Sequence, residues 1–222
     1  MTQQQVTHGA SSLQEAPDAP LAAVRVWPSE AARTWTIDAL RQAERDAAIQ
    51  AIVASGSAIC EVPQSDDLDL VLVYQGRRAS LPRPPIDVDL RQYEQDEVAR
   101  RLEAGHDYLS SVVRHGQALF DRAGWWSRLR AGWDGRLPLP SGADARARAR
   151  GAQRLCEEMQ AIGDIDAAAE LRLSTLTHLA RAALSDAGVF PQSRPELVGQ
   201  LRGVGEGSLA DRLADALAHR YG

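Results

Sequence analysis

Two aspartates one residue apart, Asp67 and Asp69, lie in an apolar run, and nine residues separate them from a Gly56-Ser57 pair. The run continues to Val73, which predicts a buried β-strand. Because alternate side chains of a strand share a face, we expect both aspartates on one face and the leucines between and after them in a core. Like charges on one face repel unless a cation neutralises them. Mg²⁺ takes hard oxygen ligands and accompanies phosphates, so the segment predicts a magnesium site.

Composition narrows the classes of function that the chain can have. Its 222 residues suit one large or two small domains, and a hydrophobic content of 44% is enough for a buried core. The net charge of −5 does not favour binding of polyanions by the molecule as a whole. All 25 residues of the lysine and arginine class are arginines, which excludes a Walker-type phosphate lysine and a lysine Schiff base. Phosphate contacts therefore fall to arginine, backbone N–H groups and hydroxyls.

The cysteines and the hydropathy pattern indicate the cellular compartment in which the protein is expected. Cys60 and Cys156 form neither a metal-ligand pattern nor a disulfide framework, so each is expected to be a small buried residue. No apolar run approaches the roughly 18 residues of a membrane span. The first residues also lack a basic segment followed by an apolar one, as a secretory signal would have. We therefore expect a soluble cytoplasmic protein with no membrane partner.

The chain divides into a tail and two domains of different composition. Residues 1–20, rich in Gln, Ser, Ala and Pro, predict a flexible tail. A break with proline and glycine at 137–142 separates a first domain, 21–137, from a second domain, 143–222. We expect an α+β fold, in which a small mixed sheet with flanking helices is followed by an all-helical bundle domain.

Hydrophobic periodicity predicts the order of the elements. We expect strands at 49–55, 68–74 and 86–90, and a short extended piece that ends near Phe120. Helices are expected at 28–47, 94–104, 143–162, 164–186, 195–201 and 207–221. The stretch 106–120 is expected to be a helix that ends in this short extended piece. In the helix at 143–162, the larger apolar residues Leu155, Met159 and Ile162 are expected on one side.

Three features of the first domain together carry chemistry. They are a Gly-Ser turn after a buried strand, the Asp-x-Asp pair, and a further acid, Asp87 or Asp89, on the strand at 86–90. Two carboxylates can hold Mg²⁺ ions that bridge a triphosphate. A third can complete the metal site or accept the proton of an attacking hydroxyl. Gly56 lets the backbone approach phosphates, which the Ser57 hydroxyl and nearby N–H groups can bind.

The spacing of these residues resembles the nucleotidyltransferase superfamily, whose catalytic domain is a palm of the DNA polymerase β type. Its pattern is an apolar residue, Gly-Ser or Gly-Gly, about ten residues, then Asp-apolar-Asp-apolar, and Gly56, Ser57, Asp67 and Asp69 occupy these positions. The resemblance covers about residues 35–125. It implies Mg²⁺-dependent transfer of a nucleoside monophosphate, from ATP or another nucleoside triphosphate, onto an acceptor hydroxyl.

The family's third acid lies on a later strand in an apolar-Asp-apolar setting. Ile86-Asp87-Val88 fits this setting and Val88-Asp89-Leu90 fits it almost as well. The resemblance thus implies that Asp67 and Asp69 hold metal. It also implies that Asp87, our first choice, or Asp89 completes the metal site or acts as base.

One segment departs from the family pattern. Many small members carry arginines directly after Gly-Ser, near the triphosphate, whereas this chain continues Ala58-Ile59-Cys60-Glu61. Triphosphate charge must then be met by Mg²⁺ or by other arginines, for which Arg77, Arg78 and Arg83 are candidates. The departure supports a second interpretation, a catalytically degenerate binding module or an antitoxin-like partner protein.

The second domain resembles the helical partner of such palms in kanamycin nucleotidyltransferase-like and minimal nucleotidyltransferase proteins, and the related HEPN domains. The resemblance lies at 179–184, 188–191 and 193–197. It implies that the substrate binds between the two domains. Related two-domain proteins often pair through such surfaces, so a homodimer is one expected assembly. The acceptor, whether a small molecule such as an aminoglycoside, a protein or an RNA, is not readable from the chain.

Three further patterns favour structural roles. Arg172 and His178 have the spacing of a ribonuclease signature of some HEPN domains, but residues six apart do not share a helix face. The tryptophans within 125–133 are expected to pack in a core rather than stack on a ligand. The alternating arginines at 146–150 spread around a helix, which predicts a solvated face.

Overall fold

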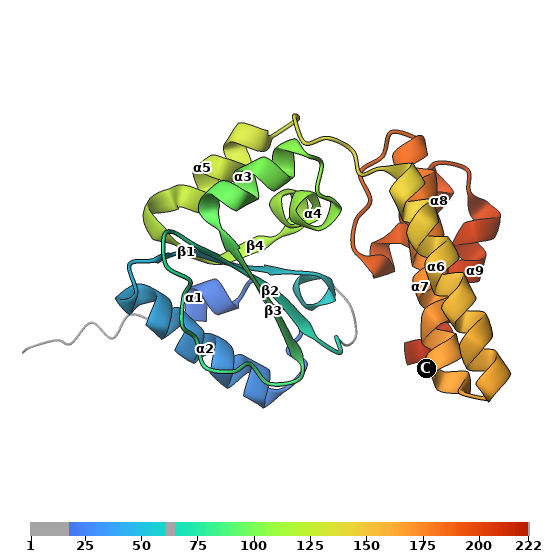
Figure 1. The fold of residues 1–222 in the computed structure, drawn as a ribbon, viewed down its shortest axis with the longest axis horizontal. Coiled ribbons are helices and arrows are strands. Elements are labelled where there is room, and N and C mark those ends of the chain that lie inside the picture. The colour runs from blue at the N-terminus through green and yellow to red at the C-terminus, as the bar shows by residue number, and fades with distance from the viewer. Residues whose placement is uncertain (1–17, 61–64, 222) are drawn as a thin grey trace, which may run out of the picture.

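The computed structural model describes residues 18–60 and 65–221, and it contains one sheet flanked by helices and a separate group of helices (Figure 1). The strands are β1 (Ile49–Ser55), β2 (Leu68–Tyr74), β3 (Val88–Glu94) and β4 (Gln117–Asp121). The helices around the sheet are α1 (Asp18–Leu21), α2 (Glu30–Arg45), α3 (Gln95–Glu103), α4 (Asp107–His115) and α5 (Trp125–Trp133). Short 3₁₀ turns lie at η1 (Ser57–Ile59) and η2 (Arg122–Gly124). We call this part, up to α5, the sheet region.

The second part, from residue 142 onward, contains helices alone and is called the helical region. Its elements are α6 (Gly142–Ile162), α7 (Ile165–Asp186), the 3₁₀ turn η3 (Arg194–Glu196), α8 (Leu197–Gly203) and α9 (Gly207–Tyr221). A mixed sheet with flanking helices followed by a helical region confirms the expected α+β class. Among the described residues, no helix combines the length and the apolar character needed to cross a bilayer.

The sheet has the strand order β3-β2-β1-β4. β1 pairs antiparallel with β2 and β4, while β2 and β3 run parallel. Figure 1 shows α2 on one face of the sheet and α3, α4 and α5 on the other. Alternate residues of the central strands fill the two cores, so that Ile52 and Leu70 face α2 while Val53 and Val71 face α4 and α5. Burial on both faces explains why β1 is apolar without alternation.

The third strand begins later than its sequence predicts. Ile86 is fully exposed, and Asp87 lies in a turn before β3. Prolines lack the N–H group that a ladder needs, and the turn closes when the N–H of Val88 bonds to the carbonyl of Pro85. The strand therefore runs from 88 to 94 rather than from 86 to 90. Asp87 and Asp89 consequently do not lie on one continuous strand face.

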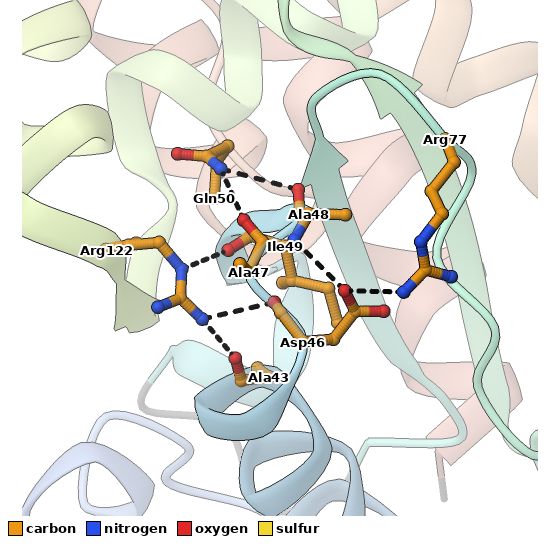
Figure 2. Close-up of polar contacts among 8 residues, drawn as sticks. All are labelled: Ala43, Asp46, Ala47, Ala48, Ile49, Gln50, Arg77 and Arg122. Atoms are coloured by element: carbon orange, nitrogen blue, oxygen red, sulfur yellow. Dashed lines mark hydrogen bonds and ion pairs between the residues drawn. The ribbon is translucent and has the colours of Figure 1, made fainter.

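Arg122 connects the end of β4 to the junction between α2 and β1 (Figure 2). Its Nε donates to the carbonyl of Ile49 at 2.7 Å, and its Nη2 donates to the carbonyls of Ala43 and, at 3.1 Å, Asp46. The last carbonyls of a helix have no partner within the helix, so a single guanidinium satisfies groups that would otherwise need water.

The Asp46 carboxylate organises the same junction from the other side (Figure 2). It accepts a hydrogen bond from the N–H of Ala48 at 3.0 Å and an ion pair from Arg77 at 3.0 Å. Gln50 donates to the carbonyls of Ala47 and Ala48. Through its ion pair with Asp46, Arg77 therefore has a structural role next to Ile49, the first residue of β1.

The helical region is built on a long hairpin of α6 and α7. Small residues of α6 contact α7, which allows a close approach of the two helices, and they are Ala145, Ala149, Ala152 and Cys156. The side of α6 that carries the larger residues is not the side packed on α7, since Leu155 is 48% and Ile162 is 72% exposed. Leucines of α7 instead form a core with α8 and α9.

Some predictions of chain organisation lie outside the description or remain untested. Residues 1–17 of the predicted tail are outside the described residues, and Asp18 begins α1. The predicted break coincides with the stretch between α5 and α6, which has no regular secondary structure from 137 to 141. The division into domains at 21–137 and 143–222 stays a prediction.

Candidate functional site

A cleft of about 1050 Å³ lies between the sheet region and the helical region. On the sheet side it is lined by the turn after β1 and by the first residues of β2 and β3, with the acids Asp67, Asp69 and Asp89. On the helical side it is lined by α6, α7 and η3, with the cations Arg148, Arg181 and Arg194. Acids outnumber cations on the sheet side, which also carries Arg25 and Arg91, and arginines outnumber the acids Asp144 and Glu196 on the helical side. We call these two sides the acidic wall and the basic wall.

Gly56 and Asp69 are in close contact on the acidic wall. Ser55 pairs with Asp69 in the β1–β2 ladder, so the turn after β1 passes directly beside the Asp69 carboxylate. Gly56 has a φ of 79°, and a Cβ at this position would collide with Oδ2 of Asp69. Only glycine accommodates both the left-handed conformation and this close approach. Strand pairing and this contact therefore bring the Gly-Ser turn and the Asp-x-Asp pair together.

The parallel pairing of β2 and β3 brings Asp89 beside Asp69. The two residues are direct partners in the ladder, and Asp67 lies two residues before Asp69. Burial raises the pKa of Asp69 from its usual 3.8 to about 6, and the negative charges of Asp67 and Asp89 add to the effect. The three carboxylates therefore act on one another electrostatically.

Asp87, the first choice for the third acid, lies apart from this group. Asp89 lines the cleft, whereas Asp87, in the turn before β3, does not. Its backbone carbonyl accepts a hydrogen bond from the N–H of Leu68, which ties the turn to the start of β2. The geometry thus favours Asp89 over Asp87 as the third acid of the site.

Asp89 is paired with an arginine that sequence reasoning did not single out. Arg91 donates to Oδ2 of Asp89 through Nη2 at 2.8 Å and Nε at 3.1 Å. Its guanidinium carbon lies 4.1 Å from the ring centroid of Tyr108. Because Arg91 follows Asp89 by two residues in the same strand, the alternation of β3 could have indicated this pairing.

The donor set can be compared with the needs of a magnesium ion. Across 18–60 and 65–221, no group of three His, Cys, Asp or Glu side chains is placed to hold one metal ion. Mg²⁺, however, is commonly held by one or two carboxylates together with substrate phosphates and water. Asp67 and Asp69, both in the cleft and Asp69 without a hydrogen bond to another described residue, fit such a two-carboxylate arrangement.

Ser57 has a structural contact in addition to its position in the cleft. Its Oγ lies 2.7 Å from Oγ of Ser65, which donates at 2.8 Å to the carbonyl of Asp67. Since the Ser65 hydroxyl has one hydrogen, the Ser57 hydroxyl donates to Ser65. This chain links the turn after β1 to the start of β2, so any phosphate bound by the Ser57 hydroxyl would compete with Ser65.

Polar contacts join the walls of the cleft, and two of them lie beside the acidic group. Sγ of Cys60, a half-buried residue after the Gly-Ser turn, lies 3.3 Å from Oγ of Ser193. Arg220 of α9 forms an ion pair with Asp66 at 2.7 Å and another with Glu170 of α7. Both contacts connect the sheet region to the helical region beside the acidic group.

The arginines proposed from sequence for the triphosphate lie elsewhere. Tyr74, at the opposite end of β2 from Asp69, pairs with Ile49, and Arg77 and Arg78 follow it. Arg77 binds Asp46 and Arg78 binds Gln92. Arg148 is exposed, as expected for a solvated face, and it also lines the cleft and pairs with Asp107 at 2.7 Å.

The tryptophans within 125–133 lie in a core, whereas one residue of the Arg172/His178 pair lies in the cleft. Trp126 is buried against α3 and α4, with Trp125 and Trp133 packed beside it, which confirms their structural role. Arg172 is exposed, as expected, while His178 lines the cleft. Burial and nearby Arg181 lower the pKa of His178, and its Nδ1 is buried without a hydrogen-bond partner among the described residues.

Comparison with known proteins finds a likeness among solved structures alone. No protein-family profile and no curated protein matches the sequence. Among solved structures, the chain is similar to a nucleotidyltransferase-like protein from Exiguobacterium sibiricum 255-15. The two are 17% identical, the match covers 85% of this chain and 71% of that chain, and the TM-score is 0.32. A likeness of this size says nothing about activity, metal or substrate.

Proposed function

We propose that this protein is a Mg²⁺-dependent nucleotidyltransferase that moves a nucleoside monophosphate onto an acceptor hydroxyl. ATP, with transfer of AMP, is the first candidate donor. The observation that supports the proposal is the packing of Gly56 against Asp69, with Asp89 paired beside it, on the wall of a large cleft. Phosphoryl chemistry of this kind needs mainly positioning and charge stabilisation, which such an arrangement provides.

The acidic residues would have two roles, metal binding and acceptance of a proton. Asp67 and Asp69 would hold Mg²⁺, which supplies positive charge to the triphosphate when bound. A cation there would also relieve the repulsion that raises the pKa of Asp69. Asp89, rather than Asp87, would accept the proton of the acceptor hydroxyl, and its pairing with Arg91 holds its carboxylate in one orientation.

The acceptor and the assembly remain proposals from the sequence. The acceptor is a hydroxyl of a small molecule such as an aminoglycoside, of a protein or of an RNA. A cleft of about 1050 Å³ has room for a nucleotide and part of an acceptor. The HEPN-like character of the helical region and a homodimer are proposed on the resemblance of the second domain to such helical domains, and a cytoplasmic location is proposed from the sequence.

Label transfer tests the function directly. The full chain is incubated with ATP labelled at the α-phosphate, Mg²⁺, and a panel of aminoglycosides, proteins and tRNA. We expect label on one acceptor class, at least a hundredfold slower transfer in Asp69→Asn and Asp89→Asn, and near-normal transfer in Asp87→Asn. Transfer that survives in Asp69→Asn, or that is lost in Asp87→Asn but not in Asp89→Asn, would contradict the assignment.

A degenerate binding module is the second candidate. It is favoured by the pairing of Asp89 with Arg91 and by the lack, in the described ranges, of three grouped metal ligands. Glu61, which also supported it, lies outside the described residues. Calorimetric titration with Mg²⁺ and ATP separates the two, because binding that is lost in a variant with both Asp67→Asn and Asp69→Asn supports the enzyme, and absence of binding supports the module.

A further inference from the structure

The acidic wall of the cleft repels a nucleotide triphosphate, and the turn after β1 offers no cation to offset this. A triphosphate carries about four negative charges at neutral pH, and it would lie beside Asp67, Asp69 and Asp89. The stretch that follows Gly56 as far as Cys60 has no basic residue. Any positive side chain that binds the phosphates must therefore come from another part of the cleft.

We propose that the basic wall of the helical region, with Arg181 and Arg194 as its principal groups, binds the triphosphate of the nucleotide. This inference rests on the proposed function for the identity of the ligand. The site it assigns is a polyphosphate-binding site, formed by α7 and η3 and facing the acidic wall.

Arg181 is the strongest indication of an anion site. Its side chain is largely buried in the cleft wall, yet it forms no ion pair or hydrogen bond with another described residue. Burial lowers its pKa, the charges of Arg194 and Arg148 lower it further, and Asp107 and Asp69 oppose this. A buried, unpaired guanidinium is costly, and such groups are retained where a ligand supplies the counter-charge.

The neighbours of Arg181 leave the wall with an excess of positive charge. Asp107 of α4, on the sheet side of the cleft, is the carboxylate whose charge most favours the charged form of Arg181, and Arg148 already binds Asp107 at 2.7 Å. Arg194 also has no ion pair with a described residue. His178, one helical turn before Arg181 on α7, adds the buried Nδ1 that lacks a partner among the described residues.

The two walls are close enough to act on one ligand. The positive charges of Arg91 and Arg194 lower the pKa of Asp69, while Asp69 stabilises the charged form of Arg181. A triphosphate between the walls would contact the arginines on one side and a cation held by the aspartates on the other. Nucleotide binding would thus require both regions.

Inorganic triphosphate tests the anion site without any need for catalysis. Its binding to the full chain is measured by calorimetry in the absence of Mg²⁺, for the wild type and for Arg181→Gln, Arg194→Gln and the control Arg172→Gln. Arg172 is exposed on the same helix and does not line the cleft. We expect at least tenfold weaker binding in the first two variants and no change in the control.

Thermal unfolding without ligand tests whether weaker binding results only from a loss of stability in the variant. Since Arg181 makes no ion pair with a described residue, Arg181→Gln is expected to keep or raise the melting temperature of the unliganded protein. A lower melting temperature for Arg181→Gln, together with unchanged triphosphate binding in Arg194→Gln, would overturn the assignment, as would a wild type that does not bind triphosphate.

The same variants separate this inference from the proposed function. If the wild type transfers label and Arg181→Gln and Arg194→Gln keep its KM for ATP, the triphosphate assignment fails and the function stands. If triphosphate binding is lost in both variants but the wild type labels no acceptor, the anion site stands and the nucleotidyltransferase proposal fails.

Discussion

Replacing Asp69 by asparagine should stabilise the protein while it removes the function that we propose. Burial and the charges of Asp67 and Asp89 disfavour the ionised Asp69 carboxylate. The carboxylate forms no hydrogen bond with another described residue, so the amide removes the charge without leaving a described partner unsatisfied. A site that holds repelling carboxylates for a cation is expected to cost stability when the cation is absent.

The pKa of Asp69 sets the size and the pH range of this effect. In the folded protein the carboxyl binds its proton more tightly than in the unfolded chain, with a pKa of about 6 against 3.8. Stability is therefore greatest below about pH 4 with respect to this group, and it falls as the pH rises through about 6. Converted at about 1.4 kcal/mol for each pKa unit, this shift lowers the free energy of unfolding by about 3 kcal/mol at neutral pH. Partial exposure of Asp69 makes about 2 kcal/mol the expected gain for Asp69→Asn at pH 7.

Urea unfolding between pH 4 and pH 7.5, together with thermal unfolding at pH 7, measures this prediction. We expect Asp69→Asn to unfold at a melting temperature roughly 4–8 °C above that of the wild type at pH 7. Near pH 4 the two proteins should have nearly equal free energies of unfolding. Asp87→Asn, outside the cleft, is the matched control and should follow the wild type. An Asp69→Asn variant that is no more stable at pH 7, or whose pH profile parallels that of the wild type, would refute the reasoning.

Three further predictions follow from other contacts. Gly56→Ala should lower the free energy of unfolding by about 2–3 kcal/mol, because its Cβ meets Asp69, whereas Gly76→Ala, with positive φ but open space, should cost about 1 kcal/mol in urea titrations. Arg122→Ala should cost about 2–4 kcal/mol by the same measurement, since carbonyls of the α2–β1 junction lose their donor, and Arg122→Lys should restore little. Millimolar Mg²⁺ should raise the melting temperature of the wild type by a few degrees but not that of Asp69→Asn.

Local patterns in the sequence predicted most of the elements. Ser29, proposed as the cap of the helix at 28–47, accepts a hydrogen bond from the N–H of Ala32 at the start of α2. The apolar runs became β1 and β2 with the expected bounds, and Gly163 ends α6 in the left-handed conformation. These features depend on propensity, capping and the two periodicities, all of which are local.

Where local reasoning failed, a contact between distant residues decided the outcome. Leu155 and Ile162 were expected on one side of their helix, but the α6–α7 contact buries the small residues of another side, so both leucine and isoleucine lie exposed. The prolines before β3 moved its start to Val88, which separated Asp87 from Asp89. Each case shows a packing or hydrogen-bond requirement that overrides periodicity.

By itself the sequence determined that Asp67 and Asp69 share a face beside the turn at Gly56, because these positions follow from strand alternation and from the spacing of a turn. Only the tertiary structure decided that Asp89 is the partner of Asp69, since strand register depends on pairing between segments about twenty residues apart. It also decided that the cations opposite come from Arg181 and Arg194. Charged residues that are distant along the chain come close together only when the two regions pack against each other. Local sequence patterns within either region do not predict this packing.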